Sequence, residues 1–172
     1  MLFSAGCSER TCVSIPEPFR ARESATRSSA RSCTSNLMKT RTIRQNVVIR
    51  ATPTQVYDAL MTSKGHAAFT GAPARISPKV GGRFTAWGGY IHGKNVELVP
   101  GKLIVQDWRP SDSSWPSDYY SRVRFQLKPV RGGTRIAFTH SRVLEEHAGH
   151  LSKGWKESYW DPLRAYFQTK KA

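Results

Sequence analysis

Regular alternation of apolar and polar side chains marks three segments of the chain as β-strands. Residues 41–50, 120–128 and 134–140 all show this alternation. A period of two is typical of strands that bury one face of a sheet and leave the other in water. The last two segments flank the turn signal Gly132-Gly133, so they are expected to pair as a hairpin.

Shorter strands are predicted between residues 74 and 109, where glycines interrupt aromatic and β-branched runs. The interruptions are two Gly-Gly pairs and the Pro100-Gly101 turn. Aromatic and β-branched residues suit a half-buried sheet, and glycine pairs favour tight turns between strands. The predicted strands are 74–78, 82–87, 90–99 and 102–109, followed by a Pro- and Ser-rich loop at 110–118.

Helices are predicted on both sides of these strands. Thr52 and Gln55 have the spacing of a capping box, and Pro53 suits a first helical position. A second short helix is expected at 64–69, and a long one from Ser152 to Gln168.

Pro162 lies inside that long helix, where we expect a kink or a break. The order of elements along the chain is a strand, two helices, a meander of about six strands and a long helix. It predicts an α+β fold in which a curved antiparallel sheet packs around the C-terminal helix.

The net charge of the chain limits the classes of partner that we expect it to bind. The formal net charge is +15, and residues 41–172 hold 21 Lys and Arg against 9 acids, so the folded part is itself basic. This favours an acidic protein partner, although basicity that serves only solubility is an equal alternative. No dense Lys/Arg block or RNA-binding aromatic signature is present, so nucleic acid is not specifically indicated. No apolar run approaches the roughly 18 residues of a membrane span, so no membrane partner is expected.

Residues 1–37 differ from the rest of the chain. They are rich in Ser and Arg and hold all three cysteines. We interpret them as a disordered extension that precedes one domain at 38–172. Natural synthesis that begins at Met38 is the favoured explanation, because the acids and prolines of the extension are unusual in a transit-like segment. The cysteine-free domain suits a reducing cytoplasm, and organellar targeting is the alternative.

The sequence shows no recognisable catalytic or metal-binding set. His147 and His150, beside two glutamates, could share a helical turn as metal ligands, but the HExxH-like spacing is missing. We interpret them as part of a solvated polar stretch before the last helix. The domain has no G-x-S-x-G motif and no cysteine. We therefore predict a non-catalytic protein without a metal or cofactor.

Three segments resemble a known family. They are HAAFTGAPA (66–74), VGGRFTAWGGYIHGKNVELVPGKLIVQDWR (80–109) and GWKESYWDPLRAYF (154–167). Together they resemble the C-terminal-type domain of the activators of heat-shock protein 90 ATPase, in the START-like, or SRPBCC, helix-grip superfamily. The most specific parts are ELVPGKLIVQDWR and GWKESYWDPL. The resemblance spans 38–168 and implies a helix-grip fold.

The resemblance implies function less firmly than fold. The eukaryotic activators carry a further N-terminal domain that makes a major part of the chaperone contact, and residues 1–37 show nothing that could supply it. We predict a protein-binding, co-chaperone-like module. The alternative is binding or transport of a small hydrophobic ligand, and a weaker one is a cyclase- or hydrolase-like enzyme.

Aromatic side chains are the candidates for lining a cavity between sheet and helix, which the helix-grip layout often encloses. The alternative is that they fill the core. The cavity candidates are Trp87, Trp108, Tyr119, Phe125, Phe138, His140, Trp155, Tyr159 and Phe167.

Basic side chains share the solvent face of the strand at 120–128 and its neighbour, and they are the candidate docking face. These residues are Arg122, Arg124, Lys128 and Arg135, to which Arg44 or Arg50 could add. An ordinary solvated sheet face is the competing interpretation. Glu97 is expected to pair with a cross-strand base, Lys102 or Arg109.

Overall fold

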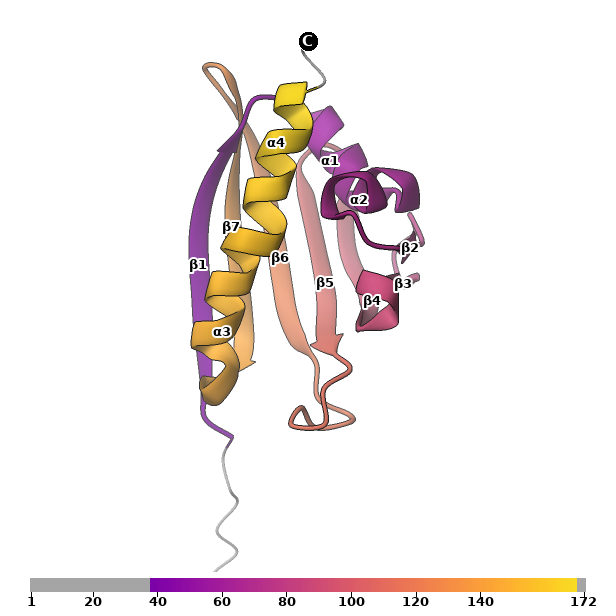
Figure 1. The fold of residues 1–172 in the computed structure, drawn as a ribbon, viewed down its shortest axis with the longest axis vertical. Helices are drawn as coiled ribbons and strands as arrows, with labels where there is room; N and C mark the ends of the chain where they lie inside the picture. The colour runs from indigo at the N-terminus through magenta and orange to yellow at the C-terminus, as the bar shows by residue number, and fades with distance from the viewer. Residues whose placement is uncertain (1–37, 170–172) are drawn as a thin grey trace, which may run out of the picture. The chain divides into compact units, whose positions relative to one another are not determined.

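Seven antiparallel strands form one curved sheet in the computed structural model, which describes residues 38–169. The expectation of disorder for residues 1–37 falls outside the described residues. The strand order is β1-β7-β6-β5-β4-β3-β2, so the first strand of the chain pairs with the last (Figure 1). The strands are β1 (Thr40–Ile49), β2 (Arg75–Ile76), β3 (Arg83–Ala86), β4 (Ile91–Val99), β5 (Leu103–Pro110), β6 (Ser121–Val130) and β7 (Gly133–Leu144).

The alternation predicted for β6 is confirmed. Val123, Phe125 and Leu127 are at most 4% exposed, whereas Arg124 and Lys128 point to solvent. The buried set faces the helices, because side chains two apart on a strand share a face. The largest differences from the predicted strand boundaries are that β2 shrinks to two residues and that β7 continues to Leu144.

The first helix begins as its sequence predicts. α1 (Pro53–Met61) is capped by Thr52, whose Oγ1 accepts from the Gln55 N–H at 3.3 Å. The Gln55 Oε1 accepts in return from the Thr52 N–H at 2.9 Å. α2 (Ser63–Thr70) follows directly, with the Thr62 Oγ1 accepting from the Gly65 N–H.

The C-terminal helix is longer than predicted. It begins as α3 (Glu145–Trp155), continues through a π-helical segment (Lys156–Trp160) and ends as α4 (Asp161–Thr169). The expected start at Ser152 is wrong, because the polar stretch that holds His147 already winds as helix and buries Ala148. The irregularity expected at Pro162 is a π turn just before it. There the Asp161 N–H donates to the Lys156 carbonyl, because the proline has no N–H to continue the regular ladder.

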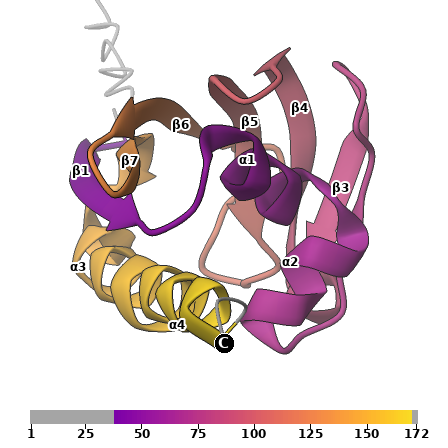
Figure 2. The same cartoon turned by 90° about the horizontal axis from the view of Figure 1, so that it is seen from above.

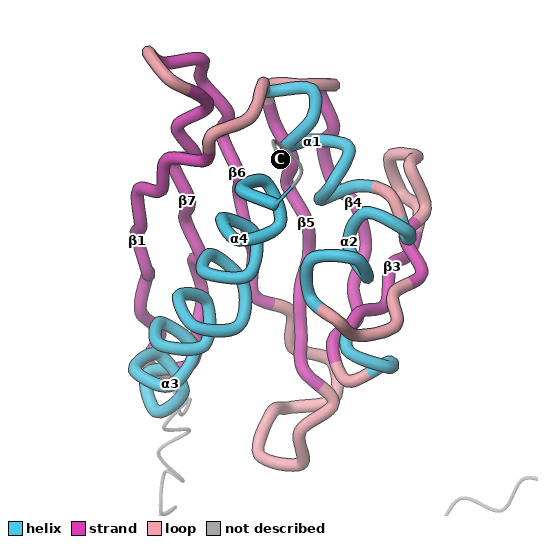
Figure 3. The backbone as a smooth tube through the Cα atoms, turned by 45° about the horizontal axis from the view of Figure 1, so that its top comes forward, coloured by secondary structure: helices cyan, strands magenta, loops and turns pink. Residues whose placement is uncertain are grey.

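The helices lie on one face of the sheet. α3 packs on β1 and β7, α1 packs on β6 and β7, and α2 contacts both α4 and the π segment. Figure 2 shows the sheet curving around these helices, and Figure 3 shows the C-terminal helix running obliquely over β1, β7 and β6. The predicted helix-grip arrangement, α+β with a curved sheet around a long C-terminal helix, is therefore confirmed. No helix within residues 38–169 is long and apolar enough to cross a membrane.

Candidate functional site

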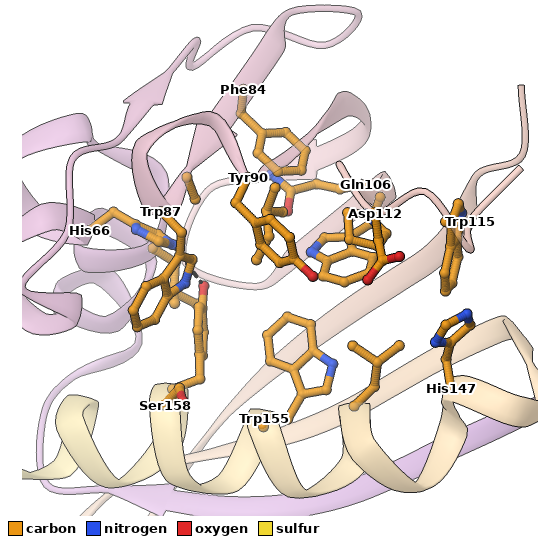
Figure 4. Close-up of a pocket in the computed structure, with 18 of the residues that line it drawn as sticks. His66, Phe84, Trp87, Tyr90, Gln106, Asp112, Trp115, His147, Trp155 and Ser158 are labelled. Atoms are coloured by element: carbon orange, nitrogen blue, oxygen red, sulfur yellow. Dashed lines mark hydrogen bonds between the residues drawn. The ribbon is translucent and has the colours of Figure 1, made fainter. Parts of the chain in front are cut away.

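A cavity of about 460 Å³ lies between the concave face of the sheet and the helices. Its walls come from α1, α2, strands β2 to β6, the loop after β5, and the C-terminal helix. Tyr90 from the sheet side and Trp155 from the helix point toward one another across it (Figure 4). This volume suits a drug-sized ligand, for which pockets of roughly 300–1,000 Å³ are typical.

Aromatic rings form most of the wall. Trp108 on β5 and Phe125 on β6 reach the cavity from the sheet, and Trp155 and Tyr159 reach it from the helix. The rings of Trp155 and Tyr159 are 4.8 Å apart, and Trp155 lies 6.0 Å from Phe125. Rings in edge-to-face contact gain energy beyond the area they bury, so these contacts stabilise this part of the wall.

A strained turn supplies another wall. Trp87 has a φ of 53°, and Gly88 and Gly89 that follow it have φ of 66° and 99°. Glycine adopts such angles freely, whereas a tryptophan does so at a cost. The turn places Trp87 against the cavity and leaves Tyr90 half exposed at its mouth. The Ser111 N–H donates to the Tyr90 carbonyl at 2.6 Å and ties the turn to the loop after β5.

His66 and Tyr159 form a polar pair in the cavity wall. The His66 Nε2 and the Tyr159 hydroxyl oxygen are 3.3 Å apart, while the buried His66 Nδ1 has no hydrogen-bond partner among the described residues. Burial lowers the pKa of His66 to about 4 and raises the pKa of Tyr159 above its ordinary value. Both side chains are therefore neutral at physiological pH.

Gln106 is a second polar group in the wall. The Asn95 amide donates to the carbonyls of Ser77 and Lys79, so its Oδ1 is left to accept from the Gln106 Nε2 at 2.8 Å. These contacts fix the orientation of both amides. The Gln106 Oε1 makes no hydrogen bond within the described part of the chain, and the Gln106 side chain lines the cavity.

An acidic side chain lies at the end of the cavity opposite the His66–Tyr159 pair. There Trp115 and His147 face each other with rings 5.3 Å apart, and Asp112 lies beside them (Figure 4). The Ser114 hydroxyl donates to the Asp112 Oδ1 at 2.6 Å and lies 3.3 Å from the His147 Nε2. Hydrogen bonds from the Ser114 side chain and backbone lower the pKa of Asp112.

This Asp-Ser-His arrangement does not match a catalytic triad. In a triad the carboxylate orients the histidine and the histidine activates the serine. Here the serine proton is donated to Asp112 instead, so His147 does not activate it. Within residues 38–169 no group of three or more His, Cys, Asp or Glu could hold a metal ion.

Five of the nine predicted cavity residues line the cavity. These are Trp87, Trp108, Phe125, Trp155 and Tyr159. The other four do not line it. Phe138 is covered by Trp155 and Trp160, with rings 4.5 and 5.1 Å away, and Phe167 is buried on α4. Tyr119 donates its hydroxyl to the Arg142 carbonyl.

His140 is the fourth, and it is fully buried with both ring nitrogens bonded. The Trp155 Nε1–H donates to the His140 Nδ1 at 3.0 Å, so the proton of the neutral ring is on Nε2. That nitrogen donates to the Ser121 hydroxyl at 2.8 Å, and the hydroxyl donates to the Trp108 carbonyl. Burial lowers the His140 pKa to about 3. The chain of bonds supports the cavity wall from behind.

Sequence reasoning missed much of the lining. His66 and Gln106 were not candidates because nothing local distinguishes them from ordinary polar positions. His147 and His150 lie at the cavity on α3, so their expected position before the helix is wrong, although His150 is exposed as a solvated stretch implies. Trp115 was hidden in the loop, although a tryptophan among Pro and Ser residues is a signal for a buried anchor, and it is 2% exposed.

Basic side chains gather on the outer face of the sheet, and their membership differs from the predicted set. Arg124 and Arg44 flank Thr139 on neighbouring strands, and Lys128 lies directly opposite Arg135. All four basic side chains are exposed, and none forms an ion pair with an acid among the described residues. We call Arg44, Arg124, Lys128 and Arg135 the basic face.

Arg122, predicted to belong to this face, is neutralised. Its Nη2 lies 2.7 Å from the Asp107 Oδ1, and its Nε lies 3.1 Å from the same atom. The pairing arises because β5 and β6 place Asp107 opposite Arg122. The register of β4 and β5 places Glu97 opposite Val105, and the ion pair expected between Glu97 and Lys102 or Arg109 does not form.

Known proteins share this fold. The solved structure of an Hsp90 activator from Plasmodium falciparum superposes with a TM-score of 0.66 at 20% identity, covering 72% of this chain and 94% of that one. The activator of 90 kDa heat shock protein ATPase homolog 1 of Homo sapiens is 27% identical over 115 residues, which are 67% of this chain and 33% of that protein.

An uncharacterized protein of Schizosaccharomyces pombe is 30% identical over 133 residues, covering 77% of this chain and 39% of its own length. The chain thus spans about a third of the length of the curated relatives it matches. The family model described as activator of Hsp90 ATPase homolog 1-like protein matches residues 50–168. This match covers most of the chain and all the walls of the cavity, and the chain belongs to that family.

Proposed function

We propose that this domain docks through its basic face onto an acidic surface of a chaperone of the heat-shock protein 90 class and acts there as a non-catalytic, co-chaperone-like module. The observation that carries the proposal is the basic face itself, where Arg44, Arg124, Lys128 and Arg135 form no ion pair with an acid among the described residues. Family membership supports the choice of partner, because the curated relatives are named as activators of that ATPase.

Energetics also support a docking role. Lys128 and Arg135 are directly opposite on neighbouring strands, and like charges in such positions destabilise a sheet. An acidic partner removes that repulsion on binding and raises the rate of association. Charges on an exposed surface act in this way over about 10 Å at moderate salt, so the association should weaken as salt is added.

A double charge reversal tests the docking face. Arg124→Glu with Arg135→Glu should weaken binding to purified heat-shock protein 90 at least tenfold at low salt, and should remove any stimulation of its ATPase activity. Lys64→Glu with Lys156→Glu changes the net charge equally on the helical side of the molecule, where both lysines are exposed, and should leave binding nearly unchanged. Equal binding by both double variants contradicts the proposal.

The cavity favours a second candidate function, the binding of a small apolar ligand. Its volume of about 460 Å³ and its aromatic walls support this. Two glycines of α3 provide a matched test. Gly154 lines the cavity and Gly149 does not, and a Cβ at either position would meet open space.

Gly154→Leu should therefore fill the cavity without removing any wall. We expect it to abolish binding of the neutral probe Nile red, measured by fluorescence, whereas Gly149→Leu should bind the probe as the parent protein does. Nile red binding that survives in Gly154→Leu, or that fails in the parent protein, overturns this second candidate.

A further inference from the structure

We infer that the cavity selects an uncharged, planar aromatic ligand with a carbonyl or ether oxygen, and that the His66–Tyr159 pair donates a hydrogen bond to that oxygen. This inference rests on the proposed binding of a small ligand in the cavity. It adds which ligands are accepted, which are rejected, and which atoms decide.

The His66–Tyr159 pair has two hydrogens that it can donate. Neutral His66 carries one N–H and Tyr159 one O–H, and their mutual bond of 3.3 Å uses one of these hydrogens. If Tyr159 donates, the buried His66 Nδ1 carries an N–H without a partner, and an unsatisfied buried donor costs about 1–3 kcal/mol.

The other tautomer instead leaves the hydrogen of the tyrosine without a partner. When the His66 Nε2–H donates to Tyr159, the Nδ1 is a bare lone pair and the tyrosine O–H is left to donate at the cavity wall. An acceptor oxygen on a ligand satisfies that O–H. Because burial lowers the pKa of His66 to about 4, the pair stays neutral and suits an uncharged acceptor.

The side chains that line the cavity disfavour a negatively charged ligand. The chain has a net charge of +15, yet the described residues that line the cavity include no Lys or Arg. The acid among these lining residues is Asp112. A carboxylate or phosphate moved into such a wall loses its hydration and meets no Lys or Arg side chain that could pair with it. The cavity therefore rejects fatty acids and phosphate esters in favour of neutral compounds.

The aromatic rings of the cavity wall favour a flat ligand. Trp87, Tyr90, Trp108, Trp155 and Tyr159 present rings to the cavity. Aromatic rings stack or meet edge to face with other rings and gain energy beyond the area they bury. Aromatic walls of this kind favour a rigid, flat ligand over a flexible alkyl chain, which loses more conformational entropy on binding.

Three naphthalene probes of matched size separate these claims. They are 2-acetylnaphthalene, which has the acceptor oxygen, 2-isopropylnaphthalene, which lacks it, and 2-naphthoate, which carries a charge. Binding to the intact protein and to Tyr159→Phe is followed by chemical-shift titration. Tyr159→Phe keeps the ring and removes only the O–H.

We expect Tyr159→Phe to weaken binding of 2-acetylnaphthalene about three- to tenfold, as loss of one hydrogen bond implies, and to leave 2-isopropylnaphthalene unchanged. We expect 2-naphthoate to bind at least tenfold more weakly than the ketone. An equal loss for both neutral probes, or naphthoate binding as tightly as the ketone, overturns the inference while the cavity remains a binding site. If neither neutral probe binds the parent protein, the proposed ligand-binding function itself fails.

Discussion

His140 shows how one buried residue makes the stability of the molecule depend on pH. Its Nδ1 accepts from Trp155 and its Nε2 donates to Ser121, so no ring position is free for a second proton. Protonation would place a hydrogen on Nδ1 against the indole N–H of Trp155. His66, which lacks a partner at Nδ1, is held neutral by burial alone.

We therefore expect stability to fall on acidification. Both histidines have pKa values lowered from 6.5, to about 4 for His66 and about 3 for His140. The unfolded chain takes up protons below pH 6.5 while the folded protein does not, so the free energy of unfolding decreases as the pH falls through this window. At pH 5 the loss is about 2 kcal/mol for each histidine.

Urea denaturation at pH 7 and pH 5 measures this loss. His140→Gln should be less stable at pH 7, because the bonds to Trp155 and Ser121 are disturbed, yet its stability should change less between the two pH values. A pH dependence identical to that of the parent protein contradicts the assignment to His140.

At the scale of elements, a glycine of the sheet and a glycine of the helix differ in the space available for a side chain. Gly93 on β4 lies directly opposite Phe84 on β3, and the phenyl ring occupies the space over the glycine. A Cβ at Gly93 would clash with the Asp107 carbonyl oxygen and lie 2.8 Å from the ring of Phe84. Gly149 on α3 has open space around its Cβ position.

Replacement by alanine should therefore act in opposite directions at these two positions. Gly93→Ala should destabilise the protein by about 2 kcal/mol or more, because backbone and a packed ring must move. Gly149→Ala should stabilise it by roughly 0.5–1 kcal/mol, since alanine is the better helix former. Thermal or urea unfolding of both variants checks the pair, and a stable Gly93→Ala variant would contradict the packing of Phe84.

At the scale of the whole molecule, the charges are separated in a way that packing does not require. The basic face lies on the outside of the sheet, whereas the cavity wall on its inner side has no Lys or Arg among its lining residues. The two sides of one sheet therefore suit different partners, an acidic surface outside and a neutral ligand inside.

If the basic face is kept for binding, relieving its repulsion should trade function for stability. Lys128→Glu places an acid opposite Arg135 and should raise the free energy of unfolding by up to about 1 kcal/mol at low salt, and by less at high salt. Lys128→Gln should give a smaller gain. Both changes should weaken binding to the chaperone. A Lys128 variant that is more stable and still binds the chaperone as tightly as the parent protein would contradict docking through the basic face.

The sequence by itself determined the order of elements, the buried faces of β6 and β7 and the start of the first helix. These depend on spacing along the chain, as in the alternation of β6 and the capping box at Thr52 and Gln55. The long amphipathic C-terminal helix could be predicted for the same reason, although its first turns could not, because their polar residues bury only Ala148 there.

Only the tertiary structure decided the site. Phe125 and Phe138 are opposite one another on neighbouring strands and point the same way, yet Phe125 lines the cavity and Phe138 is covered by Trp155. The difference depends on where the helix crosses the sheet, which no local pattern specifies. Likewise, Arg122 left the basic face because the β5–β6 register placed Asp107 opposite it. Contacts between residues far apart in sequence therefore decided which side chains remained available for binding.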